Sequence, residues 1–450
     1  MASPRSTAIK IVRKLRTGGH EAFFAGGCVR DILLRRKPRD YDVATSAHPD
    51  QVQNLFEHTV AVGKAFGVIR VRLDSHEIEV ATFRTEGAYR DGRHPSFVRF
   101  ATAREDAERR DFTINGLFYD PIRRVILDFV GGRVDLKNGL LRAIGKATER
   151  FREDQLRLLR CIRLAAQLGF RIDPATWRAV LRMAPRIRSV SAERIRDELT
   201  RLLLTPQANR GFRLLKESGL LKELLPEVEA MSGVAQPRAF HPEGDVFVHT
   251  LRVIRNLRKP NPQLAWSALL HDVGKPPTFE KAHVRGKIRI RFPDHARVGA
   301  GMAGKILRRL RFSAADRDAI VDVVSNHMTF KDVKAMRLST LKRLLARSTF
   351  DDELALHRAD CAASHGKLGN VRFLQRCRRE FSQEEIRPVR LISGRDLIAM
   401  GLKPGPCFGE ILRTIEEAQL DGKLQNREQA LTFVRKIISS NHVLRNTAVP

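Results

Sequence analysis

The chain has 450 residues, with 82 Lys and Arg against 51 Asp and Glu, so its formal net charge at pH 7 is +31. Hydrophobic residues make up 42% of the chain, which is enough for cores and excludes a disordered protein. No segment approaches the roughly 18 uncharged apolar residues that a membrane helix needs, so no membrane partner is expected. The five cysteines form no CxxC pair, which argues against a zinc ribbon and favours a reducing, cytoplasmic compartment. The positive charge indicates a polyanionic partner, and nucleic acid is the usual one.

Residues 1–20 form an acid-free amphipathic stretch with apolar side chains at Ile9, Val12 and Leu15. Transit peptides share this pattern. Because an apolar strand and a glycine turn begin near Phe23, we expect instead a first helix that belongs to the fold.

Alternating apolar residues predict β-strands over 22–25, 68–73, 78–83 and 125–130. From residue 141 onward, Leu, Ala and Arg recur at helical spacing. The predicted fold class is therefore α+β, with a small mixed β-sheet head followed by mostly α-helical modules. The expected domains are a catalytic head at 1–140, a helical neck and body at 141–240, a third domain at 241–385 and a helical tail at 386–450.

A glycine turn follows the first expected strand. Gly26 and Gly27 separate that strand from a helix that carries Arg30 in its first turn. Glycine lets backbone N–H groups approach a phosphate, and a helix N-terminus adds donors and a positive dipole. The arginine would add charge-assisted hydrogen bonds. The pattern predicts nucleotide binding, although a plain tight turn has the same sequence.

Asp40 and Asp42 lie two residues apart, and on a strand such residues point to the same face. Two neighbouring carboxylates repel each other unless a divalent cation lies between them. We therefore expect this pair to hold Mg²⁺ for phosphoryl transfer. Glu79 alternates with apolar residues in a later strand and is the candidate third carboxylate. The alternative is a solvated pair of aspartates without a ligand.

The segment Gly26-Gly27-x-Val29-Arg30-Asp31, followed by Asp40-x-Asp42, resembles the start of the class II nucleotidyltransferase family. That family comprises tRNA CCA-adding enzymes and bacterial poly(A) polymerases. Three further motifs follow in the family's order: Arg109-Arg110-Asp111-Phe-Thr-Ile-Asn115, Phe129-Val-Gly131-Gly132-Arg-Val-Asp135-Leu136 and Glu153-Asp154-Gln-Leu-Arg157-Leu-Leu-Arg160-Cys-Ile-Arg163. The resemblance implies nucleotide binding, with ribose contacts, by Arg110, Asp111 and Asn115. Arg35 departs from the family, which often has glycine there.

The third of these motifs resembles the family's base-selecting helix, which we expect to span 153–168. Asp154, Arg157, Arg160 and Arg163 recur every three residues and would form one stripe along it. Cytosine and adenine both present an amino donor beside a ring-nitrogen acceptor, whereas guanine and uracil present the reverse. A carboxylate accepts from the amino group and a guanidinium donates to the ring nitrogen, so Asp154 and Arg157 would select C and A. The other two arginines would reach phosphates; the alternative is a solvated charged face.

The resemblance implies a complete reaction. The 3′-hydroxyl of tRNA attacks the α-phosphorus of CTP or ATP and releases pyrophosphate, without a nucleic-acid template. The segment Arg84–Phe100 resembles the family's flexible loop, which favours addition of CCA or A over addition of C alone. Poly(A) polymerase activity is the alternative within the family. The sequence leaves the oligomeric state open.

A second constellation contains His271-Asp272-x-Gly274-Lys275. Together with other histidines and one aspartate it resembles the HD phosphohydrolase superfamily. The resemblance implies a divalent metal of unknown identity, for which imidazole and carboxylate are suitable ligands. The implied ligands are His249, His271, Asp272 and Asp360, with His295 and His327 as additional histidines. An HD phosphohydrolase acting on 3′ or cyclic phosphate ends of RNA is a further alternative function, and a purely structural HD fold is the other.

Overall fold

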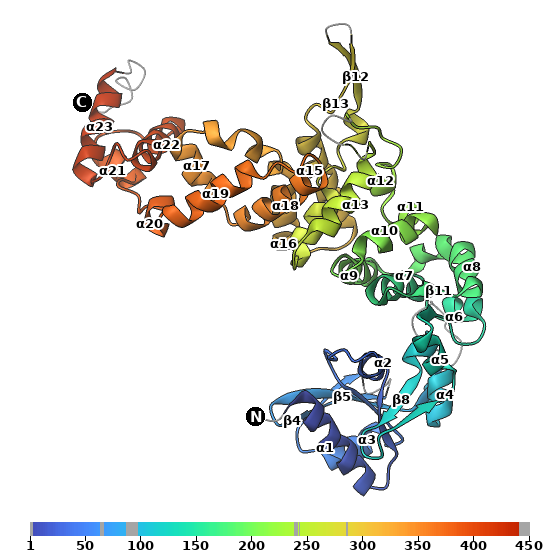
Figure 1. Cartoon of the computed structure of the whole chain (residues 1–450). Coiled ribbons are helices and arrows are strands. Elements are labelled where there is room, and N and C mark those ends of the chain that lie inside the picture. The colour runs from blue at the N-terminus through green and yellow to red at the C-terminus, as the bar shows by residue number, and fades with distance from the viewer. Residues whose placement is uncertain are drawn as a thin grey trace. The chain divides into compact units, whose positions relative to one another are not determined.

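In the computed structural model the chain divides into two compact units, residues 1–229 with 308–312 and residues 230–307 with 313–450. The structure describes residues 3–63, 67–86, 98–237, 242, 244–284 and 287–440. The predicted α+β class is confirmed, with one mixed sheet near the N-terminus and helices dominating the rest (Figure 1). Among the described residues, no helix has the length and apolar character needed to cross a membrane.

The head of the first unit contains a seven-stranded sheet with the order β3-β4-β5-β2-β1-β8-β9. Strands β2 and β5 run parallel, and the other neighbouring pairs of this sheet are antiparallel. The strands are β1 (Ala22–Ala25), β2 (Asp42–Thr45), β3 (Thr59–Gly63), β4 (Val68–Leu73), β5 (His76–Thr82), β8 (Leu117–Asp120) and β9 (Val125–Asp128). The strands predicted at 22–25 and 68–73 are confirmed with those bounds, and the other two are present with shifted ends.

Aromatic side chains pack together on the sheet of the head, and a helix at the N-terminus also belongs to it. The rings of Phe23, Phe83 and Phe118 contact one another at centroid distances of 5.8–6.2 Å. Helix α1 (Pro4–Thr17) buries Val12 and Leu15, so the expected N-terminal helix is part of the fold. The remaining head elements are α2 (Gly27–Leu33), α3 (Pro49–Leu55), β6 (Arg84–Glu86), β7 (Val98–Phe100), α4 (Ala103–Glu108), the 3₁₀ helix η2 (Thr113–Asn115) and α5 (Gly132–Lys137). Residues 87–97 of the expected flexible loop lie outside the described residues.

Helices follow the head within the first unit. They are α6 (Ala147–Glu153), α7 (Leu156–Leu168), α8 (Pro174–Met183), the 3₁₀ helix η3 (Ala184–Ser189), α9 (Ala192–Leu203), α10 (Ala208–Glu217), α11 (Leu220–Leu224) and α12 (Pro226–Glu229), with short strands β10 (Leu140–Leu141) and β11 (Arg171–Ile172). The prediction of one helix over 153–168 is wrong. Asp154 has an extended backbone, and its Oδ1 accepts a hydrogen bond from the N–H of Leu156, which starts a new helix.

The second unit is also helical. It contains α13 (Val246–Asn256), α14 (Pro262–Leu270), η4 (Pro276–Thr278), β12 (Glu280–Val284), β13 (Lys287–Arg291), α15 (His295–Arg309), α16 (Ala314–Asn326), η5 (Thr329–Ala335), α17 (Leu338–Leu345), α18 (Phe350–Ala363), α19 (Gly369–Glu380), α20 (Gln383–Ile386), α21 (Gly394–Ala399), α22 (Pro406–Leu420) and α23 (Arg427–Ser440). The last three helices share a small core that includes Leu397, Ile411 and Val434.

Candidate functional site

The glycine turn between β1 and α2 has the geometry that the sequence predicted. Gly26 adopts φ +69° and ψ −129°, which side-chain-bearing residues rarely adopt, and Gly27 starts α2. A Cβ atom on Gly26 would lie 3.1 Å from Nη1 of Arg110, so glycine also permits this close approach. Arg30 is buried and donates hydrogen bonds to the side chains of Asp31 and Asn115.

Asp42 is the first residue of β2, and Asp40 precedes that strand rather than lying on it as expected. The parallel register pairs Val43 with Val80, so Asp42 and Glu79 stand side by side immediately before it. Burial and the nearby Asp40 and Glu79 together raise the pKa of Asp42 to about 6, against the opposing effect of Arg110. A divalent cation would relieve this repulsion, so the residues fit a metal site.

The ribose motif forms a network of buried charges. Asp111 is buried; its Oδ1 accepts hydrogen bonds from Asn115 and from the backbone N–H of Phe112. Its Oδ2 accepts hydrogen bonds from Nε and Nη2 of Arg160 at 2.9 and 2.7 Å. Burial raises the pKa of Asp111, but Arg160 and Asn115 lower it more, so the net pKa lies well below the ordinary value. The carboxylate is therefore charged and held in place.

Arg157 is buried at the start of α7. Its Nη1 donates to Oε2 of Glu153 at 2.5 Å and to the backbone oxygen of Arg150 at 2.9 Å. Asp154 is held from the other side, because Nη2 of Arg194 donates to its Oδ2 at 2.7 Å. Both side chains of the expected base-reading pair are thus fixed before any nucleotide binds, although they lie at a helix junction and not on one helix stripe.

Arg163 differs from the expectation that it reaches phosphates. Its Nε donates to Oε2 of Glu198, a buried carboxylate of α9, and its Nη1 donates to Gln167. Arg160 is likewise paired with Asp111. These two arginines join α7 to neighbouring elements.

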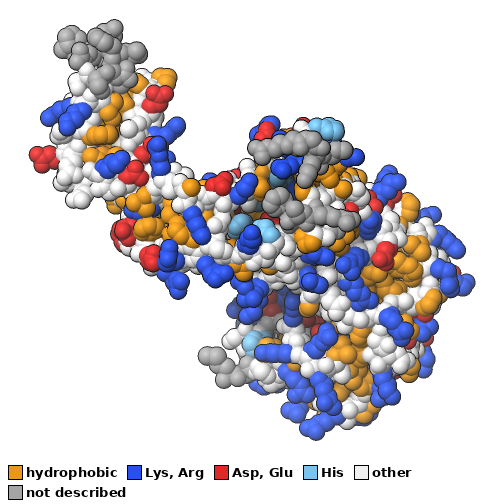
Figure 2. Space-filling view, turned by 45° about the horizontal axis from the view of Figure 1, so that its top comes forward, with side chains coloured by type: hydrophobic (Ala, Val, Ile, Leu, Met, Phe, Trp, Pro, Cys, Tyr) orange, Lys and Arg blue, Asp and Glu red, His pale blue; other side chains and the backbone are white. Residues whose placement is uncertain are grey.

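A single cavity of about 1180 Å³ gathers the predicted nucleotide-binding residues. The sequence-predicted residues in its lining are Gly26, Gly27, Arg30, Asp40, Asp42, Arg110, Asp111, Asn115, Asp154, Arg157, Arg160 and Arg163. Glu79 is not in the lining; its Oε1 lies 3.3 Å from Nη2 of Arg70. Lys and Arg side chains are also abundant over the outer face seen in Figure 2.

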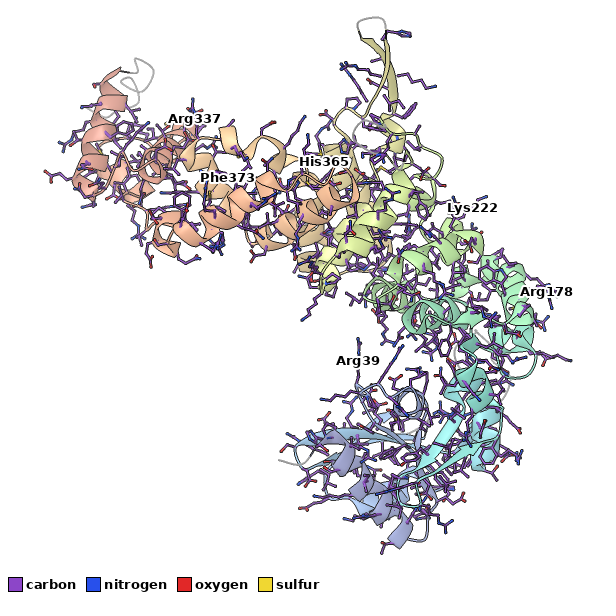
Figure 3. The ribbon with its side chains drawn as sticks, in the orientation of Figure 1. Arg39, Arg178, Lys222, Arg337, His365 and Phe373 are labelled. Carbon is purple, nitrogen blue, oxygen red and sulfur yellow. The ribbon has the colours of Figure 1, made fainter. Side chains whose placement is uncertain are left out.

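Sequence reasoning missed several cationic residues of this lining. Arg36, Lys37 and Arg39 belong to a charge run directly before Asp40 that was visible in the sequence, and Arg39 is labelled in Figure 3. Arg194 and Arg201 come from α9 and carry no local sequence signal. The cavity is therefore strongly cationic around its few carboxylates, as a triphosphate requires.

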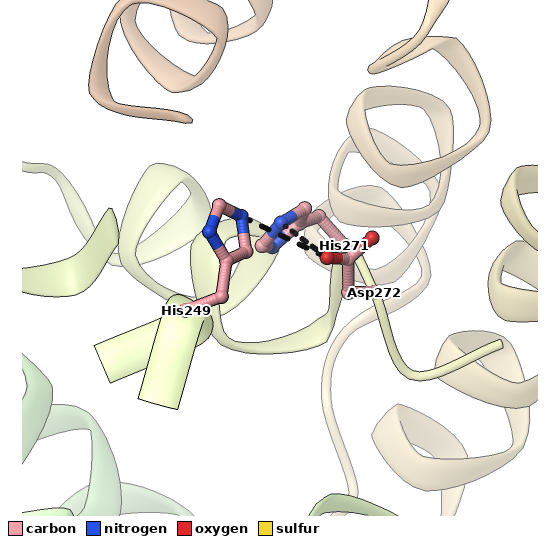
Figure 4. Close-up of side chains that lie close together, drawn as sticks. All are labelled: His249, His271 and Asp272. Atoms are coloured by element: carbon pink, nitrogen blue, oxygen red, sulfur yellow. Dashed lines mark ion pairs between the residues drawn. The ribbon is translucent and has the colours of Figure 1, made fainter. Parts of the chain in front are cut away.

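The second constellation forms a buried cluster in the second unit. His249, His271 and Asp272 place one potential ligand atom each within 4.8 Å of one another. Figure 4 shows these three side chains close together. The Nε2 atom of His249 lies 3.0 Å from Oδ1 of Asp360, which completes the predicted core set. A second group joins Asp272 to His295 and His327 in the same way.

The tautomers of three histidines follow from their backbone contacts. The Nδ1 atoms of His271, His295 and His327 lie 2.9, 3.0 and 2.7 Å from backbone carbonyl oxygens, which only accept hydrogen bonds. Each Nδ1 therefore carries the proton and each Nε2 presents a lone pair. The Nε2 atoms of His295 and His327 face each other at 3.2 Å, and that of His271 is buried without a hydrogen bond. Burial lowers the pKa of His327 to about 3, which keeps it neutral. This donor set fits a divalent metal.

Close backbone packing explains why the His-Asp motif has glycine at position 274. A Cβ atom there would lie 2.2 Å from the backbone oxygen of His295 and 2.5 Å from the backbone nitrogen of Gly299. The segment that carries Asp272 can therefore pack against the start of α15 only with glycine at this position.

Three family models match the chain. Residues 22–142 match the poly A polymerase head domain, residues 169–231 match the "Probable RNA and SrmB- binding site of polymerase A", and residues 246–361 match the HD domain. The head and HD models coincide with the two constellations described above.

Full-length relatives are also similar. The chain is 32% identical over 426 residues to the CCA-adding enzyme of Streptococcus sanguinis, covering 94% of this chain and 95% of the relative. It is 29% identical over 444 residues to the CCA-adding enzyme of Lactobacillus johnsonii, covering 97% and 98%.

Solved structures show the same fold. The Bacillus stearothermophilus CCA-adding enzyme in complex with CTP matches with a TM-score of 0.77 at 27% identity, covering 98% of this chain and 99% of that chain. The Thermotoga maritima CCA-adding enzyme complexed with tRNA_CCA matches with a TM-score of 0.56 at 20% identity, covering 96% and 94%, and that likeness concerns the fold alone.

Proposed function

The chain belongs to the family of CCA-adding enzymes, and from this premise we propose that its head cavity adds C, C and A to the 3′ end of tRNA from CTP and ATP. The observation that carries the proposal is the convergence of the glycine turn, the Asp40 and Asp42 carboxylates, and the Asp154–Arg157 pair on one cavity. Both the head and the HD domain imply dependence on a divalent metal.

We assign the head metal to Asp40 and Asp42 with Glu79 beside them, and Mg²⁺ is the ion that suits such oxygen ligands. When bound, the ion supplies positive charge that activates the attacking oxygen and neutralises the triphosphate. The glycine turn and the first N–H groups of α2 bind phosphate oxygens. The cations of the lining orient the rest of the triphosphate, and Asp111 and Asn115 position the ribose. The free thiols of the described cysteines fit a cytoplasmic location.

The number of nucleotides added to a tRNA that lacks its 3′ end tests this function. With CTP and ATP present, three added nucleotides are expected. A long ladder of A residues would instead assign the chain to poly(A) polymerases, and no addition at all would contradict both activities.

Asp154→Ala is expected to lower the preference for CTP over UTP about tenfold or more, measured as the ratio of kcat/KM values. Asp154 accepts from the amino group that C and A carry, while uracil presents a carbonyl oxygen to the same carboxylate. Each such mismatch costs roughly 1–3 kcal/mol, and removal of the carboxylate abolishes the repulsion.

Glu193→Ala is the matched control, because it removes an exposed carboxylate next to Arg194 that does not line the cavity. It should leave the ratio unchanged. An unchanged ratio in an active Asp154→Ala enzyme would refute base selection by this residue.

The HD centre supports a second function, phosphohydrolysis of 3′ or cyclic phosphate ends of RNA. Its support is the two ligand groups that share Asp272, together with Asp360 beside His249. In this reaction water attacks phosphorus and the ester P–O bond breaks, which leaves a sugar hydroxyl and a phosphate product. Lys275 donates to Gln236 and lies 2.7 Å from Asp272, where its charge holds the carboxylate ionised.

Asp272→Ala is expected to lower the amount of metal bound at the HD centre to less than about a tenth, because this carboxylate belongs to both ligand groups. Phosphatase activity should disappear with the metal, while CCA addition continues at the head. Elemental analysis after chelation and reloading measures the first effect. His365→Ala, an exposed histidine outside the cluster, is the control. Loss of nucleotide addition in a folded Asp272→Ala protein would contradict the separation of the two sites.

A further inference from the structure

A two-stranded ribbon beside the HD centre takes no part in either site described above. Strands β12 and β13 form a sheet of their own, with antiparallel register from Glu280 opposite Arg291 to Val284 opposite Lys287. In the sequence the ribbon lies between Lys275 and His295, so both of its ends adjoin the metal cluster. It extends away from the helices of its unit (Figure 1).

The ribbon is cationic. The side chains of Lys281, Arg289 and Arg291 are exposed, and Glu280 is the one acidic residue in the sequence 280–291. Arg289 and Arg291 alternate on one strand, so they lie on the same face about 6.6 Å apart along it, opposite Ala282 and Glu280, whereas Lys281 lies on the other face. A pair of cations at this spacing offers two successive contacts to the phosphates of an extended nucleic-acid strand.

An aromatic pair lies at the base of the ribbon. The rings of Phe279 and Phe292 are 5.9 Å apart at an interplanar angle of 61°. Phe292 is fixed inward, because Nζ of Lys275 lies 5.4 Å from its ring and the ring of His295 lies 6.4 Å away. Phe279 keeps 36% of its surface exposed. It therefore presents a ring to solvent between the cationic strands and the metal ligands, where a base can stack.

We propose that the ribbon and Phe279 bind the single-stranded end of an RNA and direct its terminal phosphate to the HD centre. Arg289 and Arg291 contact backbone phosphates and Phe279 stacks on a base. The delivery of the phosphate rests on the proposed phosphohydrolase function, whereas the binding of the strand does not. A protein β-strand is the other occupant that an unpaired ribbon edge accepts, but the excess of cations favours a polyanion.

The test measures binding of a fluorescent, unstructured 12-nucleotide RNA with a 3′-phosphate to the full chain by anisotropy. The double variant Arg289→Gln, Arg291→Gln is expected to bind about tenfold more weakly near 0.1 M salt. The slope of log affinity against log salt should fall by about 1.4, since each phosphate contact to a single strand contributes about 0.7.

A matched control removes two exposed cations from α19 of the same unit, by Arg372→Gln and Arg379→Gln. Its affinity should stay near that of the original chain. Equal losses in the two double variants would show general electrostatic attraction and overturn the ribbon site, and so would an unchanged affinity in the ribbon variant.

Phe279 allows a second, charge-neutral test. Phe279→Ala should weaken RNA binding about fivefold, while Phe279→Trp should restore it, because stacking depends on an aromatic face. A 4-thiouridine near the 3′ end should crosslink within residues 279–291, and crosslinks confined to other segments would contradict the proposal. With 3′-phosphorylated RNA the alanine variant should show a raised KM, whereas hydrolysis of p-nitrophenyl phosphate, which has no strand, should not change. If the original chain hydrolyses neither ester, the phosphohydrolase function fails, and the binding measurements still decide the ribbon site.

Discussion

Replacement of Asp42 by alanine is expected to lower the rate of nucleotide addition about a thousandfold, which corresponds to roughly 4 kcal/mol of lost transition-state stabilisation. Asp42 lines the cavity and lies near Asp40 and Glu79. Burial and these two carboxylates raise its pKa to about 6. Without it, the charge needed to hold a divalent ion at the triphosphate is missing. Single-turnover addition of C at saturating CTP measures the effect.

The affinity for tRNA should change little in this variant, because backbone phosphates and not the catalytic carboxylates determine it. Asp42→Asn keeps the side-chain volume and should be similarly inactive, whereas Glu57→Ala removes an exposed carboxylate outside the cavity and should be fully active. Retention of more than about a tenth of the original rate in either Asp42 variant would show that the assignment is wrong.

The local features of this site were predictable from the sequence, because each depends on residues close together in the chain. The strand 22–25, the glycine turn and the Asp40–Asp42 pair all follow from spacing. The candidate ligands of the HD centre came from the resemblance to the HD superfamily, and the structure brings them close together.

Long-range partners were not predictable in the same way. The periodicity of residues 153–168 indicated one helix, but a hydrogen bond from the Leu156 N–H to Asp154 divides it in two. Arg194 holds Asp154 from 40 residues away, and nothing in the spacing of either residue indicates that contact. The parallel pairing of β2 with β5, which brings Glu79 beside Asp42, is likewise a property of the sheet topology. The hydrogen bond from Arg163 to Glu198 also joins residues far apart in the sequence, and no local pattern indicates it.

Arg160→Met should lower the free energy of unfolding of the first unit by about 1–3 kcal/mol, the usual cost of leaving a buried hydrogen-bonding group without its partner, because Asp111 is buried while a third of the Arg160 side chain is exposed. Two nitrogens of Arg160 donate to Oδ2 of Asp111, and the carboxylate is buried. Methionine keeps the apolar stem of the side chain and removes only the charge. Trp177 is the tryptophan of this unit, so its fluorescence during urea unfolding in a Trp266→Phe background reports the effect.

The double variant Arg160→Met, Asp111→Asn should regain much of this loss, because it leaves no buried charge, and the asparagine oxygen still accepts from Asn115 and Phe112.

The pH dependence of stability gives an independent check. In the original chain the folded pKa of Asp111 lies below its unfolded value of about 3.9, so the stability from the pair is complete above that pH and is lost as the pH falls toward the folded pKa. In Arg160→Met the arginine no longer lowers the pKa of Asp111, and burial raises this pKa above its unfolded value. As the pH falls, the folded state of the variant therefore takes up a proton before the unfolded state does. This uptake stabilises the variant relative to the original chain. The difference in unfolding free energy between the two proteins should therefore shrink from pH 7 to pH 4. A difference that stays constant over this range would show that the charge of Asp111 is not what Arg160 balances.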